Sequence, residues 1–133
     1  MDVLAHFRKA RNTVTMPRGG VLFAEGERGT HMYILMQGRA EISVGGQIVE
    51  NAGPGALLGE MALVSSAPRS ATIIAATECK LVSVDVRQFD LLVRESPEFA
   101  RQVMTVMADR VRRTNERLRE ALSQLSARGR RPK

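Results

Sequence analysis

The residues best suited to chemistry in this sequence lie between Gly55 and Thr72, where a carboxylate, an arginine and a hydroxyl stand close together. Gly59 follows an apolar stretch and opens a short segment of helical propensity, Glu60 to Val64. The first amide groups of a helix have no partners inside it, and a glycine lets an anion approach them closely. The pattern therefore predicts a phosphate-binding turn at Gly59.

Two side chains near this turn suit a sugar phosphate. Arg69 follows an expected turn at the edge of the same cavity, where its guanidinium can donate a forked pair of hydrogen bonds to a phosphate. Ser70 adds a hydroxyl donor, and Glu60, the one carboxylate of the segment, can accept a hydrogen bond from a sugar hydroxyl. Each residue alone has an ordinary role, Arg69 as a surface charge and Glu60 as a helix-terminal acid. Their combination favours a binding site.

The region that must position this segment runs from Thr13 to Asp85. Short apolar or alternating runs are separated there by glycines, and Gly45-Gly46 is typical of a two-residue hairpin turn. Many short strands with regular turns predict a small barrel or sandwich. The expected fold class is α+β, with a jelly-roll-like β-roll of about eight short strands over residues 1–96 and helices after it.

Helical spacing replaces the strand pattern after Asp85. This aspartate is suited to cap a short helix, and Ser96 followed by Pro97 predicts the start of a second one. The second helix is long, and we expect it over residues 97–126. A basic flexible tail is expected over residues 127–133.

The long helix carries two apolar stripes. One is suited to packing on the roll and consists of Phe99, Val103 and Val106. The other advances in steps of three and four and consists of Met104, Met107, Val111, Thr114, Leu118, Ala121 and Leu125. Such steps are typical of a coiled-coil seam and predict a parallel homodimer. The alternative is a C-terminal half of the helix that stays exposed.

The string Gly-Glu-Met-Ala-Leu at 59–63 with Ala-Pro-Arg-Ser-Ala-Thr at 67–72 resembles the phosphate-binding cassette of the cyclic-nucleotide-binding domain family. Less specific family motifs at residues 23–27 and 33–38 agree with this cassette, so the resemblance covers nearly the whole chain. It implies a cassette at residues 59–72 inside a β-roll, and a non-enzymatic receptor that needs no cofactor or metal.

The resemblance also implies roles for single residues. Arg69 and Ser70 would bind the cyclic phosphate, and Glu60 would bind the ribose 2′-hydroxyl. The resemblance also implies ligand contacts by Gly59, Met61 and Ala71. It implies that the side chains of Val49 and Leu58 lie against the base. Leu58 departs from the family, which usually has Phe before Gly-Glu, but both side chains are apolar.

Other positions bear on which base is bound. In the family, guanine preference often accompanies Thr directly after the cassette arginine, so Ser70 favours adenine. Thr114 and Asn115 resemble the pair with which catabolite-activator-type members reach the adenine amino group, Thr114 from its own subunit and Asn115 from the neighbour. Arg110, one turn earlier, is expected to pair with Glu60. The alternative for Thr114 is that it only sets the register of the seam.

These assignments predict a receptor that binds cyclic AMP, and cyclic GMP more weakly. A ligand biases the long helix only if it contacts that helix better in one of two states, and a nucleotide touching both cassette and helix meets this condition. We therefore expect the signal to pass through the C-terminal helix.

The composition fits one domain of ordinary size. The chain has 133 residues, 44% of them hydrophobic, and no apolar run approaches the roughly 20 residues that cross a bilayer. The single cysteine, Cys79, is expected to be a buried core thiol, which suits the cytoplasm. The net charge of +6 belongs to residues 108–133, whereas the first 107 residues balance to zero. We expect that basic segment to be mainly a solvated helix face.

Competing function classes have less support in the sequence. A cupin-type metal enzyme needs clustered ligands, but His6 and His31 stand in different elements. A scaffold with an unused pocket would be expected to lack Arg69 or Glu60. The chain has no helix-turn-helix after the long helix, so sequence-specific DNA binding is not expected. Its ends look natural and favour a stand-alone receptor; the alternative is a sensor fragment of a transcription factor, channel or kinase, with an unknown downstream partner.

Overall fold

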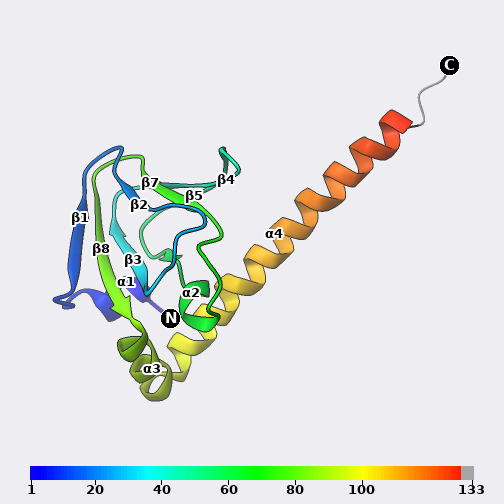
Figure 1. The fold of residues 1–133 in the computed structure, drawn as a ribbon. Helices are drawn as coiled ribbons and strands as arrows, with labels where there is room; N and C mark the ends of the chain where they lie inside the picture. The colour runs from blue at the N-terminus through cyan, green and yellow to red at the C-terminus, as the bar shows by residue number, and fades with distance from the viewer. Residues whose placement is uncertain (130–133) are drawn as a thin grey trace.

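The computed structural model describes residues 1–129 as a β-roll followed by two helices (Figure 1). The strands are β1 (Thr13–Met16), β2 (Val21–Phe23), β3 (His31–Gln37), β4 (Ala40–Val44), β5 (Gln47–Ala52), β6 (Leu57–Leu58), β7 (Thr72–Ala75) and β8 (Cys79–Asp85). The helices are α1 (Val3–Phe7), α2 (Met61–Val64), α3 (Val86–Glu95) and α4 (Pro97–Gly129). This architecture confirms the predicted α+β class and the β-roll.

The strands form two antiparallel four-stranded sheets, in the orders β1-β8-β3-β6 and β2-β7-β4-β5. Successive side chains of a strand point to opposite faces, so a strand covered on both sides supplies two cores. On β3, Met32 and Ile34 pack with the helices, whereas Leu35 packs inside the roll. The buried thiol of Cys79, expected in the core, also lies inside the roll.

The hairpin between β4 and β5 turns at Gly45 and Gly46, as predicted. Both glycines have positive φ, +58° and +82°, which a tight two-residue turn requires. The turn pairs Val44 with Gln47 and returns the chain along β5, which carries Val49 and Glu50. The hairpin therefore brings these two residues to the edge of the roll.

Local capping determines where the C-terminal helices start. At α3, the Asp85 carboxylate accepts from the Gln88 amide at 2.8 Å, and the Gln88 side chain accepts from the Asp85 amide at 2.9 Å. At α4, the Ser96 hydroxyl accepts from the Phe99 amide at 3.2 Å. Both predicted starts are confirmed.

Helix α4 extends beyond its predicted end. It is helical through Gly129, the last described residue, so residues 127–129, expected in the flexible tail, are helical. Ala127 and Arg128 are good helix formers, which explains why the helix continues past Ser126. The rest of the expected tail, residues 130–133, lies outside the described residues.

One end of the roll is closed by helices. Phe99 and Val103 of α4 are buried against it, and Val106 is partly buried, as the first apolar stripe predicted. The unpredicted α1 also packs there, with its Phe7 ring edge-on to Phe99 at a centroid distance of 6.0 Å. The C-terminal part of α4 projects away from the roll (Figure 1).

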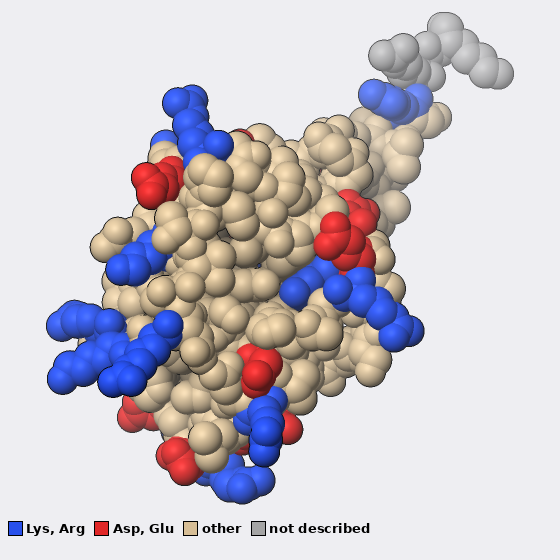
Figure 2. Space-filling view, turned by 60° about the vertical axis from the view of Figure 1, so that its left-hand side comes forward, with Lys and Arg blue, Asp and Glu red and all other residues tan. Residues whose placement is uncertain are grey.

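The charged surface and the helices bear on the expected partners. Acidic and basic side chains are both distributed over the visible face of the roll (Figure 2), in line with the neutral balance of its sequence. Within residues 1–129, no helix combines the length and apolar character needed to cross a bilayer.

Candidate functional site

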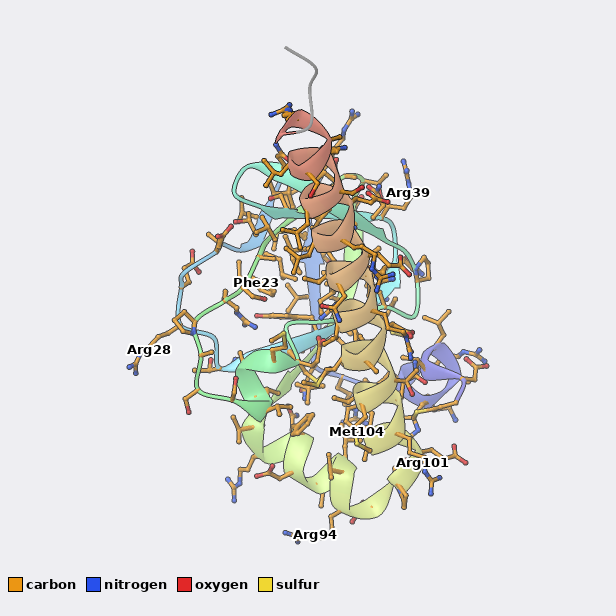
Figure 3. All side chains as sticks on the ribbon, turned by 90° about the vertical axis from the view of Figure 1, so that its right-hand side faces the viewer. Phe23, Arg28, Arg39, Arg94, Arg101 and Met104 are labelled. Carbon is orange, nitrogen blue, oxygen red and sulfur yellow. The ribbon has the colours of Figure 1, made fainter. Side chains whose placement is uncertain are left out.

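A cavity of about 510 Å³ lies between the roll, α2 and α4. In Figure 3, α4 runs in front of the roll, with Phe23 beside it on the roll and Met104 toward its lower end. The predicted site residues that line this cavity are Val49, Gly59, Met61, Arg69, Ser70, Ala71, Thr114 and Asn115. The structure thus brings the cassette and the long helix to one space.

The turn at Gly59 is one that only glycine fits. Its φ is +77°, and a Cβ atom there would lie 2.4 Å from Nη1 of Arg69 and 3.1 Å from the Phe23 ring. Gly59 follows β6 and leads into α2, so the chain reverses tightly at the cassette. The absence of a side chain is what lets the Arg69 guanidinium lie against the backbone.

Arg69 is buried inside the roll with only 7% of its surface exposed. Its Nη1 donates to the Gly59 carbonyl at 3.1 Å and its Nη2 to the His31 carbonyl at 2.7 Å. The guanidinium carbon lies 3.9 Å from the centroid of the Phe23 ring. Among the described residues, its Nε atom is buried without a hydrogen-bond partner.

Burial lowers the pKa of Arg69, because a charged group loses hydration inside the roll. Coulombic interactions with Tyr33, Glu27 and Glu60 act in the opposite direction. An arginine nevertheless stays protonated at neutral pH. The cassette therefore holds a desolvated cation beside the cavity, as an anion-binding site requires.

Glu60 is completely buried behind the cavity wall. One carboxylate oxygen, Oε1, accepts a hydrogen bond from Nη1 of Arg110, which confirms the predicted pair. Arg110 also donates to the Leu57 carbonyl at 2.9 Å. The other oxygen of Glu60, Oε2, is buried without a partner in the described residues. The cassette is therefore tied directly to α4.

Two more arginines of α4 turn toward the roll. Nη2 of Arg113 lies 3.1 Å from Oε1 of Glu50, and Arg117 donates to the Val49 carbonyl. The expectation of a mainly solvated basic face is wrong for Arg110, which is partly buried, whereas Arg113 and Arg117 stay exposed although they contact β5. Their spacing of three and four residues places them on one side of α4, where β5 and β6 offer a carboxylate and carbonyl oxygens. That spacing was the signal available in the sequence.

Leu58 does not line the cavity, although the resemblance implied a wall beside the base. It is fully buried with Phe23 and Leu35 inside the roll. Leu58 is the residue of β6 that faces into the roll, so it belongs to the core. Val44 of β4 lines the cavity together with Val49 instead. Sequence reasoning also missed Phe23, whose ring lies under Arg69.

Thr114 and Asn115 both line the cavity of their own chain. The sequence had assigned Asn115 to the cavity of a neighbouring subunit. The two residues are adjacent on α4, and the cavity extends far enough around the helix to include both.

Comparisons with known proteins agree with this site. Residues 13–96 match the model of the family described as Cyclic nucleotide-binding domain. The chain is 39% identical over 98 residues to a cyclic nucleotide-gated potassium channel of Mesorhizobium japonicum, covering 74% of this chain and 27% of the channel. It is 31% identical over 126 residues to a CRP-like cAMP-activated global transcriptional regulator of Mycobacterium tuberculosis, covering 91% of this chain and 56% of the regulator.

The fold has counterparts among solved structures. The catabolite activator protein of Thermus thermophilus superposes with a TM-score of 0.73 at 28% identity, covering 84% of this chain and 54% of that protein. The chain thus spans about half, or less, of these relatives. The family match extends over most of the roll, including the cassette that holds Arg69 and Glu60, and the fold agrees with it. The chain therefore belongs to the cyclic nucleotide-binding domain family.

Proposed function

We propose that this chain is a non-enzymatic receptor that binds cyclic AMP, and cyclic GMP more weakly, in the cavity between the roll and α4. One observation carries the proposal. Two buried ionic groups at the cassette each keep one polar atom without a partner in the described residues, Nε of Arg69 and Oε2 of Glu60. Buried polar atoms are nearly always hydrogen-bonded, so a ligand with a matching acceptor and donor is expected there.

A cyclic nucleotide offers both groups at once. Its phosphate oxygens would accept from Arg69, which now donates only to carbonyl oxygens, and a charged acceptor makes the stronger hydrogen bond. Its ribose 2′-hydroxyl would donate to Glu60 once ligand binding uncovers this carboxylate, which is completely buried and does not line the cavity. Ser70 lines the cavity beside Arg69 and would add a donor to the phosphate.

The same contacts connect the ligand to α4. Glu60 is the partner of Arg110, so a hydroxyl that binds this carboxylate acts on the helix as well. Thr114 and Asn115 would contact the base from α4. Because such a ligand touches both the roll and the helix, it can favour one position of α4 over another. We infer that the signal passes along α4.

The outer face of α4 supports a parallel homodimer. Met104, Val111, Leu118 and Leu125 follow one another at intervals of seven and are 56–61% exposed. Of the seam positions, Met107, Val111 and Thr114 line the cavity, so the seam free of it runs through Leu118 and Leu125. A seven-residue apolar repeat on a long helix is the pattern of a coiled coil. Sedimentation of the purified chain tests this: a dimer that Leu118→Glu with Leu125→Glu converts to monomer is expected, and a wild-type monomer would contradict it.

Calorimetric titration with cyclic AMP and cyclic GMP tests the receptor assignment. Saturable binding near one ligand per chain is expected, tighter for cyclic AMP. Failure of both nucleotides to bind would overturn it and favour a scaffold with an unused pocket. We further place the receptor in the cytoplasm, which the free and buried Cys79 supports.

A further inference from the structure

Arg117 lies at the end of the cavity away from the cassette. It follows Arg110 by two turns of α4, which is about 10 Å along the helix axis. Arg110 binds Glu60 at the cassette, whereas Arg117 reaches the backbone of β5 at Val49. Both Arg117 and Val49 line the cavity. If the phosphate binds at Arg69, the purine extends toward this second end.

The three α4 arginines at the cavity differ in their partners. Arg110 pairs with the carboxylate of Glu60, and Arg113 pairs with that of Glu50. Arg117 donates to a carbonyl oxygen, and within residues 1–129 no carboxylate lies within ion-pair distance of it. A guanidinium has five N–H donors in a rigid plane. No carboxylate of the described residues therefore offsets the charge of Arg117, and it has further donors for a ligand.

We propose that Arg117 is a specificity-determining residue that donates hydrogen bonds to the O6 and N7 acceptors of a guanine base. An arginine can only donate, and guanine presents two acceptors on this edge. Adenine presents an amino donor where guanine has O6, so it cannot accept the same pair. The hydrogen bond from Arg117 to the Val49 carbonyl holds the guanidinium at the cavity wall where the base would lie.

This inference rests on the proposed receptor function and deepens it. Ser70, Thr114 and Asn115 favour adenine, whereas Arg117 acts in the opposite direction. Arg117 would then supply the affinity that the receptor has for cyclic GMP. Loss of Arg117 should widen the preference for cyclic AMP, and loss of Thr114 and Asn115 should narrow it.

The experiment compares three ligands on the full chain by calorimetric titration. Cyclic AMP and cyclic GMP are joined by cyclic IMP, whose base has the O6 and N7 of guanine but no 2-amino group. The variants are Arg117→Ala and, as a matched control, Arg112→Ala, because Arg112 is exposed, pairs with Asp109 and does not line the cavity. Because Arg117 is exposed, we expect Arg117→Ala to weaken the binding of cyclic GMP and cyclic IMP by only about 5- to 10-fold. The affinity for cyclic AMP should be nearly unchanged.

The outcomes separate the two proposals. If Arg117→Ala weakens the binding of all three ligands equally, or of none of them, Arg117 does not recognise the base. The receptor assignment then stands. If the wild-type chain binds none of the three, the receptor assignment itself is overturned. Circular dichroism establishes that each variant is folded, and Arg117→Gln replaces Arg117→Ala if the alanine variant is not.

Discussion

The two ends of the cavity present arginines to a ligand in different environments. At the cassette, Arg69 is buried, stacked on Phe23 and bonded to two carbonyl oxygens of the roll. On α4, Arg113 and Arg117 reach across from the surface of a helix to β5. Buried, hydrogen-bonded charges have one geometry and interact strongly, whereas exposed ones are screened by water and adjust easily.

This difference suggests a division of roles. The cassette is suited to supply affinity for the sugar phosphate that every cyclic nucleotide shares. The α4 end is suited to select the base and to respond to it, because its contacts are weaker and belong to a helix that projects from the roll (Figure 1). Arg110 connects the two ends, since it sits on α4 and binds the buried Glu60.

The largest effect is expected at Arg69. Arg69→Ala removes the charge-assisted donors to the phosphate and should weaken nucleotide binding by roughly 2–4 kcal/mol, which is about 30- to 700-fold in Kd. Calorimetric titration of a variant with a native circular dichroism spectrum measures it, with Arg112→Ala as the exposed control. Near-normal affinity would show that affinity does not reside at the cassette.

The next effect concerns the stability of the cassette itself. Gly59→Ala places a methyl group against Arg69 and Phe23 at a φ of +77°. The backbone strain alone should lower the free energy of unfolding by about 1–3 kcal/mol. Urea denaturation measures this, and Gly53→Ala is the matched control because a Cβ atom there meets nothing within 4 Å. Equal stability of the two variants would contradict the tight turn.

The same contrast explains what could be predicted from the sequence. Local signals identified the cassette, the Gly45-Gly46 hairpin and the caps at Asp85 and Ser96, because each depends on residues close together in the chain. The partners of Arg113 and Arg117 could not be found in this way. They depend on which strand lies beside α4, a choice made by long-range packing.

Leu58 and α1 illustrate the same limit. The family resemblance implied a place for Leu58 on the cavity wall, but the pairing of β6 with β3 turns this side chain into the core. Helix α1 is short, and its burial depends on Phe99, a residue far along the chain. Periodicity within a segment shows that a residue will be buried, but not against what.

A smaller effect is expected for the base contacts of α4. Thr114→Ala with Asn115→Ala should lower the ratio of cyclic GMP to cyclic AMP dissociation constants by about 2- to 10-fold, the contribution of one ordinary hydrogen bond. Parallel titrations with both nucleotides give the ratio. An unchanged ratio would place base selection elsewhere in the cavity and remove the proposed role of these two residues.

The smallest effect is expected for the ion pair between Glu50 and Arg113. Both side chains are partly exposed, at 26% and 44%, so water screens their attraction. A double-mutant cycle with Glu50→Ala and Arg113→Ala should give a coupling free energy of about 0.2–1 kcal/mol in urea denaturation. Added salt should reduce it further, since exposed charges are screened over about 10 Å at 0.1 M. A salt-independent coupling above about 2 kcal/mol would mean that this end of the cavity is held as firmly as the cassette, because only poorly hydrated pairs interact so strongly.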